Sequence, residues 1–189
     1  MNARLYASPC CTLTLLTALV GQPVLAADAA PTVGDMAPDF ELSALDGGQV
    51  KLSKLTDTGP VVLVVLRGYP GYQCPLCTRQ FGEYLNKANG FKQANAKVVF
   101  VYPGPADNLT KHAGDFVRGK TIPDHFYVLL DPDYTFTKPY GLRWDAKNET
   151  AYPSTFVLDS ARKVAFANVS KSHGGRVKAD DALQALLVK

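Results

Sequence analysis

The stretch VVLVVLRGYPGYQCPLCTRQF, residues 61 to 81, predicts a strand, a loop and a helix in direct succession. Its first part, Val61 to Arg67, is an uninterrupted run rich in β-branched residues, which is typical of a strand buried on both faces of a sheet. From Pro75 to Asn89 the apolar residues recur with helical spacing, and we expect Gly90 to end this helix. The stretch therefore predicts one strand and one helix of an α/β fold.

The same alternation continues on both sides of this stretch. A β-hairpin over residues 37–55 is expected before it, with its turn at Asp46-Gly47-Gly48. After it we expect strands at 97–103 and 125–131, a partly helical segment at 106–117, a short helix near 134–140, a hairpin of strands 155–159 and 163–169, and a final helix in 178–188. Strands that alternate with helices and end in a hairpin predict a central mixed β-sheet with helices on both faces, a three-layer α/β sandwich.

The bulk composition is that of an ordinary globular protein. The chain has 189 residues, 47% hydrophobic and 20% charged, which suits one domain with a sizeable core. Its formal net charge is +3, with no basic run and no acidic tail. This balance gives no reason to expect nucleic acid or an anionic membrane surface as a partner.

The N-terminus has the pattern of a cleaved secretory signal peptide over residues 1–26. Arg4 provides a positive start, Thr12 to Val20 is a short apolar core, and small residues precede a cleavage position after Ala26. The apolar core is much shorter than the ~20 residues that span a bilayer, although an uncleaved anchor is the alternative. We therefore expect a periplasmic or secreted protein without stable membrane insertion, with a flexible start at 27–33 and a domain at 34–189.

Signal cleavage would also remove Cys10 and Cys11, so the exported protein would keep only Cys74 and Cys77, in a compartment where thiols tend to oxidise. The pair lies at the expected helix N-terminus, where Pro75 fits the first turn. Free N–H groups and the partial positive charge at a helix N-terminus stabilise a thiolate. A spacing of three places both sulfur atoms on one helix face, close enough for a Cys74–Cys77 disulfide.

The residues leave several alternatives to a redox-active pair. A zinc site needs two further ligands, and His112, His125 and His173 are isolated in the sequence. Covalent haem needs a histidine directly after the second cysteine, where this chain has Thr78. Copper held by the cysteines and His173 stays open. A structural disulfide is disfavoured because so short a loop adds little stability.

Four segments resemble the peroxiredoxins, the alkyl hydroperoxide reductase and thiol-specific antioxidant family. They are GDMAPDFEL (34–42), YPGYQCPLC (69–77), LLDPDYTFTKPYGL (129–142) and YPSTFVLD (152–159), in that order. The resemblance implies a thioredoxin-like fold that carries an N-terminal hairpin. It also implies a thiol-based peroxidase that needs no cofactor, with a hydroperoxide as substrate and a thioredoxin-like protein as electron donor.

The match to the family's active-site pattern is partial. The pattern Pro-x-x-x-Thr-x-x-Cys falls on Pro70 and Cys77, which implies that Cys77 attacks the peroxide. Cys74 stands where the family has threonine, so it becomes a resolving thiol that condenses with oxidised Cys77 to a disulfide.

The family's active-site arginine is also missing from its usual place. In the family this residue lies beside the strand at 155–159, and Pro153 occupies the position here. Arg67, at the end of the strand before the cysteines, and Arg143 are candidates to supply the positive charge. With Pro70, Tyr152 and Pro153, they make up the predicted substrate-binding set.

Tyr152-Pro153 instead resembles thioredoxin-like reductases, in which a cis-proline faces a Cys-x-x-Cys pair. We therefore predict a cis Tyr152–Pro153 bond, against a background of ~5% for such bonds in folded proteins. This resemblance implies an alternative function, the reduction of protein disulfides, in which Cys74 attacks and Cys77 releases the mixed disulfide. A copper-binding module is the third hypothesis.

Overall fold

The computed structural model describes residue 1 and residues 29–187 of the chain. The predicted signal peptide therefore lies almost entirely outside the described residues, and its cleavage stays a prediction. From residue 29 onward the chain packs against the domain, where Ala29 and Ala30 lie next to Gly141. No helix in the described part of the chain is long and apolar enough to cross a bilayer.

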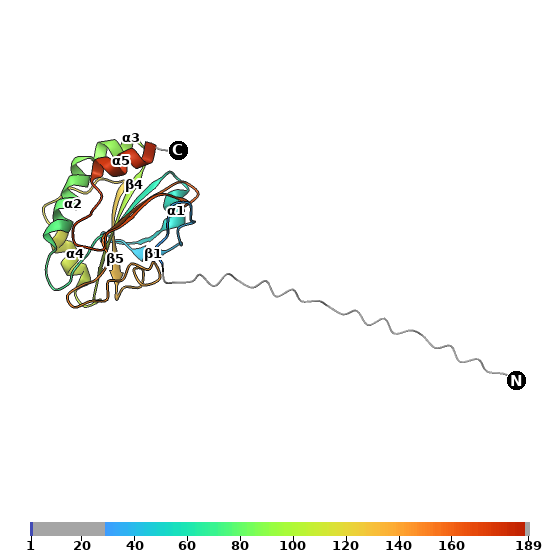
Figure 1. Ribbon diagram of the computed structural model, residues 1–189, viewed down its shortest axis with the longest axis horizontal. Coiled ribbons are helices and arrows are strands. Elements are labelled where there is room, and N and C mark those ends of the chain that lie inside the picture. Colours follow the sequence, from blue (N-terminus) through green and yellow to red (C-terminus); the bar gives the residue numbers. More distant parts are fainter. Residues whose placement is uncertain (2–28, 188–189) are drawn as a thin grey trace.

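Five strands of the described residues form the central mixed sheet, in the order β5-β4-β3-β6-β7 (Figure 1). The central strand β3 (Val61–Val65) runs parallel to β4 (Lys97–Gly104), which in turn runs parallel to β5 (Phe126–Pro132). On the other side, β6 (Ser154–Leu158) is antiparallel to β3, and β7 (Val164–Val169) is antiparallel to β6. Every residue of β3 is buried, as its β-branched sequence predicts.

A separate two-stranded hairpin precedes the sheet, as predicted. Strand β1 (Glu41–Ser43) pairs with β2 (Gln49–Lys51), and Ala44 forms a bridge to Leu129 of β5. The hairpin is shorter than the sequence suggested, because residues after Lys51 form a helix, α1 (Leu52–Thr56). Leu52 and Leu55 are spaced three apart, and both are buried in the core, which is the spacing of a helix and not of a strand.

The helices and the hairpin cover opposite faces of the sheet. Figure 1 shows α2 (Pro75–Asn86), α3 (Ala88–Gln93), α4 (Leu109–Val117) and α5 (Ala179–Leu187) on one side and α1 with the hairpin on the other. Alternate strand residues face the two layers: Val62 and Val64 join the helical core, whereas Leu63 and Val65 join the core beneath the hairpin. The predicted three-layer α/β sandwich is confirmed.

Two predictions about helices were wrong. Gly90 does not end the helix of the cysteines, because α2 ends at Asn86 and Gly90 lies inside α3. A side chain at Gly90 would come within 3.0 Å of Leu183, so this glycine allows α5 to pack closely. Residues 134–140 form turns instead of a short helix. Asp133 and Tyr134 have φ angles of 51° and 65° there, which interrupt a right-handed helix.

Candidate active site

The loop after β3 first continues beside β4, where the N–H groups of Leu66 and Tyr69 donate to the carbonyls of Val101 and Pro103 at 3.0 Å, and then turns into α2. Gly68 allows this turn, since it has φ +65° and a side-chain carbon would lie 1.9 Å from the carbonyl oxygen of Pro103. The loop is then held by Gln73, whose Oε1 accepts from the Tyr102 hydroxyl at 2.9 Å and whose Nε2 donates to the carbonyl of His112 at 2.7 Å. These contacts fix where α2 begins.

Cys74 and Cys77 face each other across the first turn of α2. Cys74 is the N-cap residue, and the backbone N–H of Cys77 donates to its Sγ at 3.3 Å. Pro75 occupies the first helical turn, as predicted. The two side chains are 3% and 0% exposed. Both cysteines are free thiols here, so the Cys74–Cys77 disulfide stays a prediction.

Arg176 is the cation that contacts the sulfur atoms, although no sequence pattern predicted it as a site residue. Its Nη2 lies 3.4 Å from Sγ of Cys77 and 3.7 Å from Sγ of Cys74. Its Nη1 donates to Gln80 Oε1 at 3.0 Å, and Gln80 is a buried residue of α2. Arg176 thus places a fixed positive charge on both sulfurs from the segment between β7 and α5.

The negative charge of the pair is favoured on Cys74. The pKa of Cys74 is lowered to about 5, chiefly by the hydrogen bond from the Cys77 thiol, with the backbone N–H of Cys77 and the charges of Arg176 and Arg67 adding to it and burial opposing it. Burial raises the pKa of Cys77, and its hydrogen bond to Cys74 raises it further. The reduced pair therefore holds a thiolate at the helix N-cap and a thiol one turn later.

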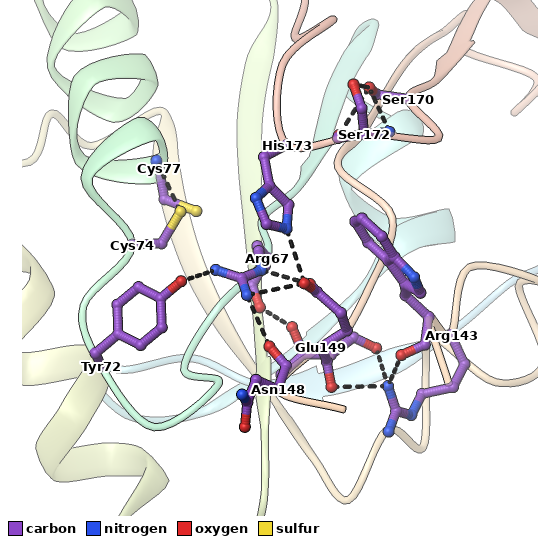
Figure 2. Close-up of polar contacts among 12 residues, drawn as sticks. Arg67, Tyr72, Cys74, Cys77, Arg143, Asn148, Glu149, Ser170, Ser172 and His173 are labelled. Atoms are coloured by element: carbon purple, nitrogen blue, oxygen red, sulfur yellow. Dashed lines mark hydrogen bonds and ion pairs between the residues drawn. The ribbon is translucent and has the colours of Figure 1, made fainter. Parts of the chain in front are cut away.

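Arg67 lies beside the pair but is bound mainly to a carboxylate. It donates to Glu149 through Nε at 2.6 Å and Nη2 at 3.1 Å, to the Tyr72 hydroxyl at 2.6 Å and to the carbonyl of Asn148 at 2.7 Å. Figure 2 shows its guanidinium between Tyr72 and Glu149. Its charge lowers the pKa of Cys74, but its side chain makes no hydrogen bond to sulfur in the described structure.

Glu149 joins Arg67 to His173. Nε2 of His173 lies 2.8 Å from Oε1 of Glu149, on the side away from Tyr72 (Figure 2). Burial alone would raise the pKa of the Glu149 carboxyl, but the hydrogen bonds from Arg67 and His173 hold it below its usual value. Glu149 was not predicted as a site residue, because it lies in a polar loop 82 residues after Arg67.

Arg143, the other candidate cation, supports the loop that carries Glu149. Its Nη1 donates to the carbonyls of Trp144, Glu149 and Thr150, and its guanidinium lies 4.0 Å from the ring centre of Tyr134. Figure 2 shows it on the far side of Glu149 from the cysteines. The structure therefore gives Arg143 a part in holding the loop and places Arg176, not Arg143, on the sulfurs.

The predicted cis bond between Tyr152 and Pro153 was wrong. The described residues contain no cis peptide bond. Tyr152 donates to the carbonyl of Leu142, and the carbonyl of Pro153 accepts from Ser170, both at 2.9 Å. With the peptide bond trans, these two hydrogen bonds hold the segment between Leu142 and the residue that follows β7. The ring of Tyr152 stacks on Trp144, with centroids 4.9 Å apart, while Pro70 lies half-buried in the loop before α2.

The three histidines do not gather around the cysteines. His112 stacks on Tyr69 at a centroid distance of 3.5 Å, His125 contacts the carbonyl of Ala88, and His173 binds Glu149. No group of three or more histidine, cysteine, aspartate or glutamate side chains in the described structure could hold a metal ion. The copper hypothesis, which needed His173 beside the sulfurs, therefore has no ligand set there.

Comparison with known proteins gives consistent matches. A family model described as the AhpC/TSA family matches residues 33–167. A putative peroxiredoxin of Mycobacterium tuberculosis is 31% identical over 155 residues, covering 81% of this chain and 94% of the relative. Peroxiredoxin Bcp of Bacillus subtilis is 28% identical over 133 residues, covering 67% of this chain and 78% of that protein. The crystal structure of peroxidoxin BcpB from M. tuberculosis superposes with a TM-score of 0.65 at 28% identity, covering 82% of this chain and 96% of that chain.

Proposed function

Because this chain belongs to the AhpC/TSA family and is a thiol-dependent peroxidase of the peroxiredoxin type, we propose that Cys74 and Cys77 carry out its reaction as a dithiol–disulfide couple. The observation that carries this proposal is the contact of Arg176 with both sulfur atoms at the N-terminus of α2. A fixed cation stabilises a thiolate and also the charge that develops on peroxide oxygen in the transition state.

The cycle has three balanced steps. A thiolate attacks one oxygen of the hydroperoxide, the O–O bond breaks, and the sulfur becomes a sulfenic acid while the other oxygen leaves as an alcohol or water after taking a proton. The second cysteine attacks the sulfenic sulfur, the S–O bond breaks, water leaves and a disulfide forms. A dithiol donor of the thioredoxin-like class then reduces this disulfide by exchange and becomes oxidised itself.

The structure favours Cys74 as the attacking thiolate, whereas the family pattern in the sequence favours Cys77. The pKa of Cys74 is lowered to about 5, and its sulfur receives the Cys77 backbone N–H. Cys77 is fully buried and its pKa is raised. Because the thiolate and not the thiol is the nucleophile, Cys74 attacks first and Cys77 resolves.

Stopped-flow oxidation by hydrogen peroxide tests both the cycle and the order of the cysteines. Cys77→Ser is expected to react rapidly and to accumulate a sulfenic acid on Cys74 that dimedone traps, whereas Cys74→Ser reacts slowly. Rapid oxidation of Cys74→Ser with an inert Cys77→Ser would show the opposite order. Slow oxidation of the wild type would contradict peroxide reduction by this pair.

Reduction of protein disulfides is the second candidate function. The supporting observation is that a low-pKa Cys74 precedes a buried Cys77, which suits attack on a disulfide followed by release of the mixed disulfide. Tyr72 beside the pair is 49% exposed and offers an aromatic contact to a protein partner. A Cys77→Ser protein that captures a partner in a covalent complex, without peroxide consumption by the wild type, would favour this function.

Export to the periplasm or outside of the cell completes the proposal. Its support is the sequence pattern of residues 1–26, with a positive start, a short apolar core and small residues before the expected cleavage position. N-terminal sequencing of protein recovered from its native cells is expected to begin at Ala27. An intact N-terminus in a cytosolic fraction would contradict it.

A further inference from the structure

Two residues of the segment 170–176 contact different parts of the active site. Arg176 lies on the sulfur atoms, at 3.4 and 3.7 Å. His173 lies on Glu149, at 2.8 Å. The two are also joined directly, because Nε of Arg176 donates to the carbonyl oxygen of His173 at 3.1 Å. A displacement of His173 therefore moves an acceptor that orients the Arg176 guanidinium.

The side chain of Glu149, which binds His173, is itself held in a fixed position. It is 11% exposed and accepts two bonds from Arg67, which is itself buried. The ring of Trp144 also contacts His173, with the two ring centres 5.2 Å apart. By contrast the imidazole is 45% exposed, so its position depends on these two contacts and not on enclosure in the core.

Other contacts hold the segment 170–176 near its two ends. The N–H of Ser170 donates to the carbonyl of Pro153 at 2.9 Å, Nζ of Lys171 lies 4.2 Å from the ring centre of Tyr152, and Arg176 donates to Gln80. Residues 171–175 are all exposed, and the turn is organised locally by the hydroxyl of Ser170, which contacts the carbonyls of Ser172 and Gly174 at 2.9 and 2.6 Å. Gly175 has φ +63°, which favours glycine. Segments with few buried apolar contacts open at low free-energy cost. Between these ends, the bond from His173 to Glu149 holds the exposed middle of the segment against the site.

We propose that His173 is a positioning residue, whose bond to Glu149 holds the segment 170–176 so that Arg176 stays on the two sulfur atoms. His173 touches neither sulfur and acts through Arg176. The inference rests on the proposed function for its rate readout, while the ionisation of the cysteines provides a readout independent of peroxide. Both His173 and Arg176 lie beyond residues 33–167, the range matched by the family model.

A double-mutant cycle tests this dependence. His173→Ala is expected to slow oxidation by hydrogen peroxide about 10-fold, since small misplacements of a catalytic group cost up to ~10²-fold. Arg176→Gln is expected to slow it about 100-fold, as the loss of a transition-state donor does. The double variant is expected to match Arg176→Gln within about 2-fold, because His173 has no effect once Arg176 is gone.

The ultraviolet absorbance of the thiolate, followed against pH, gives the second readout. Both single variants are expected to raise the apparent thiolate pKa, and His173→Ala is expected to add nothing in the Arg176→Gln background. His173→Gln, which keeps a donor for Glu149, should recover part of the loss. Ser172→Ala, in the same segment, is the matched control and should behave as wild type. If Arg176→Gln does not fold, Arg176→Met, which also removes the charge, takes its place in the cycle.

Two results would overturn the proposal. One is an equal effect of His173→Ala on the thiolate pKa with and without Arg176, which would show that His173 acts independently. The other is a wild-type thiolate pKa in His173→Ala, which would show that the segment needs no such tie. A wild type that does not react with peroxide would instead contradict the proposed function and leave the thiolate titration as the deciding measurement.

Discussion

Replacing Glu149 with alanine removes the carboxylate that binds the buried Arg67 guanidinium. Arg67 is 3% exposed and donates to that carboxylate at 2.6 and 3.1 Å. Its remaining partners, the Tyr72 hydroxyl and the Asn148 carbonyl, are uncharged oxygens. Because the loss of one partner leaves a buried charge uncompensated, we expect the free energy of unfolding to fall by about 3–5 kcal/mol.

Urea unfolding measures this change through the midpoint and slope of the transition. Asp145→Ala is the matched control, since Asp145 is 94% exposed and pairs with Arg143 at 3.5 Å. Its removal should change the free energy of unfolding by less than about 1 kcal/mol. Replacing both buried partners, as Arg67→Met with Glu149→Leu, should recover most of the lost stability. A fall of less than about 1 kcal/mol for Glu149→Ala alone would refute this reasoning.

Two further predictions concern the thiolate and the packing of the helices. The pKa of Cys74 is lowered to about 5, so alkylation of Cys74 by iodoacetamide should be fast above that pH and slow down as the pH falls through it. A rapid phase that persists in Cys74→Ser would contradict the assignment of the thiolate to Cys74. In α2, a methyl group added at Gly82 would meet no atom within 4 Å, so Gly82→Ala should raise the free energy of unfolding by about 0.5–1 kcal/mol, as measured by thermal unfolding. A methyl group added at Gly90 would lie 3.0 Å from Leu183 of α5, so Gly90→Ala should not give this stabilisation. Equal stabilisation by Gly82→Ala and Gly90→Ala would show that α5 does not pack tightly against Gly90.

Much of the fold could be predicted because its signals are local. The β-branched run at Val61 to Val65 makes a buried central strand, and the apolar spacing after Pro75 makes a helix. The errors arose where tertiary contacts decide. Gly90 is a helix-ending residue by local preference, but close packing on Leu183 needs a glycine inside α3. At residues 134–140 the positive φ angles of Asp133 and Tyr134 interrupt a right-handed helix, and the carboxylate of Asp131 accepts the N–H groups of Phe136 and Thr137 in the turns that form instead.

The site was predictable only where its residues are neighbours in the sequence. Cys74 and Cys77 follow from a spacing of three at a helix start, and Arg67 from the end of the strand before them. Arg176 lies 99 residues after Cys77, and no local pattern connects a glycine turn after β7 to the N-terminus of α2. Only the antiparallel return of β6 and β7 beside β3 brings that turn to the cysteines.

Counting thiols after one equivalent of hydrogen peroxide is the most direct test of the central claim, that Cys74 and Cys77 form one redox couple. The chain from Ala27 onward contains these two cysteines alone. Both thiols are expected to disappear together within the fast phase, with a mass loss of two hydrogens and a Cys74–Cys77 disulfide in the peptide map. Retention of one thiol beside a stable oxyacid on the other, or of both thiols, would contradict it.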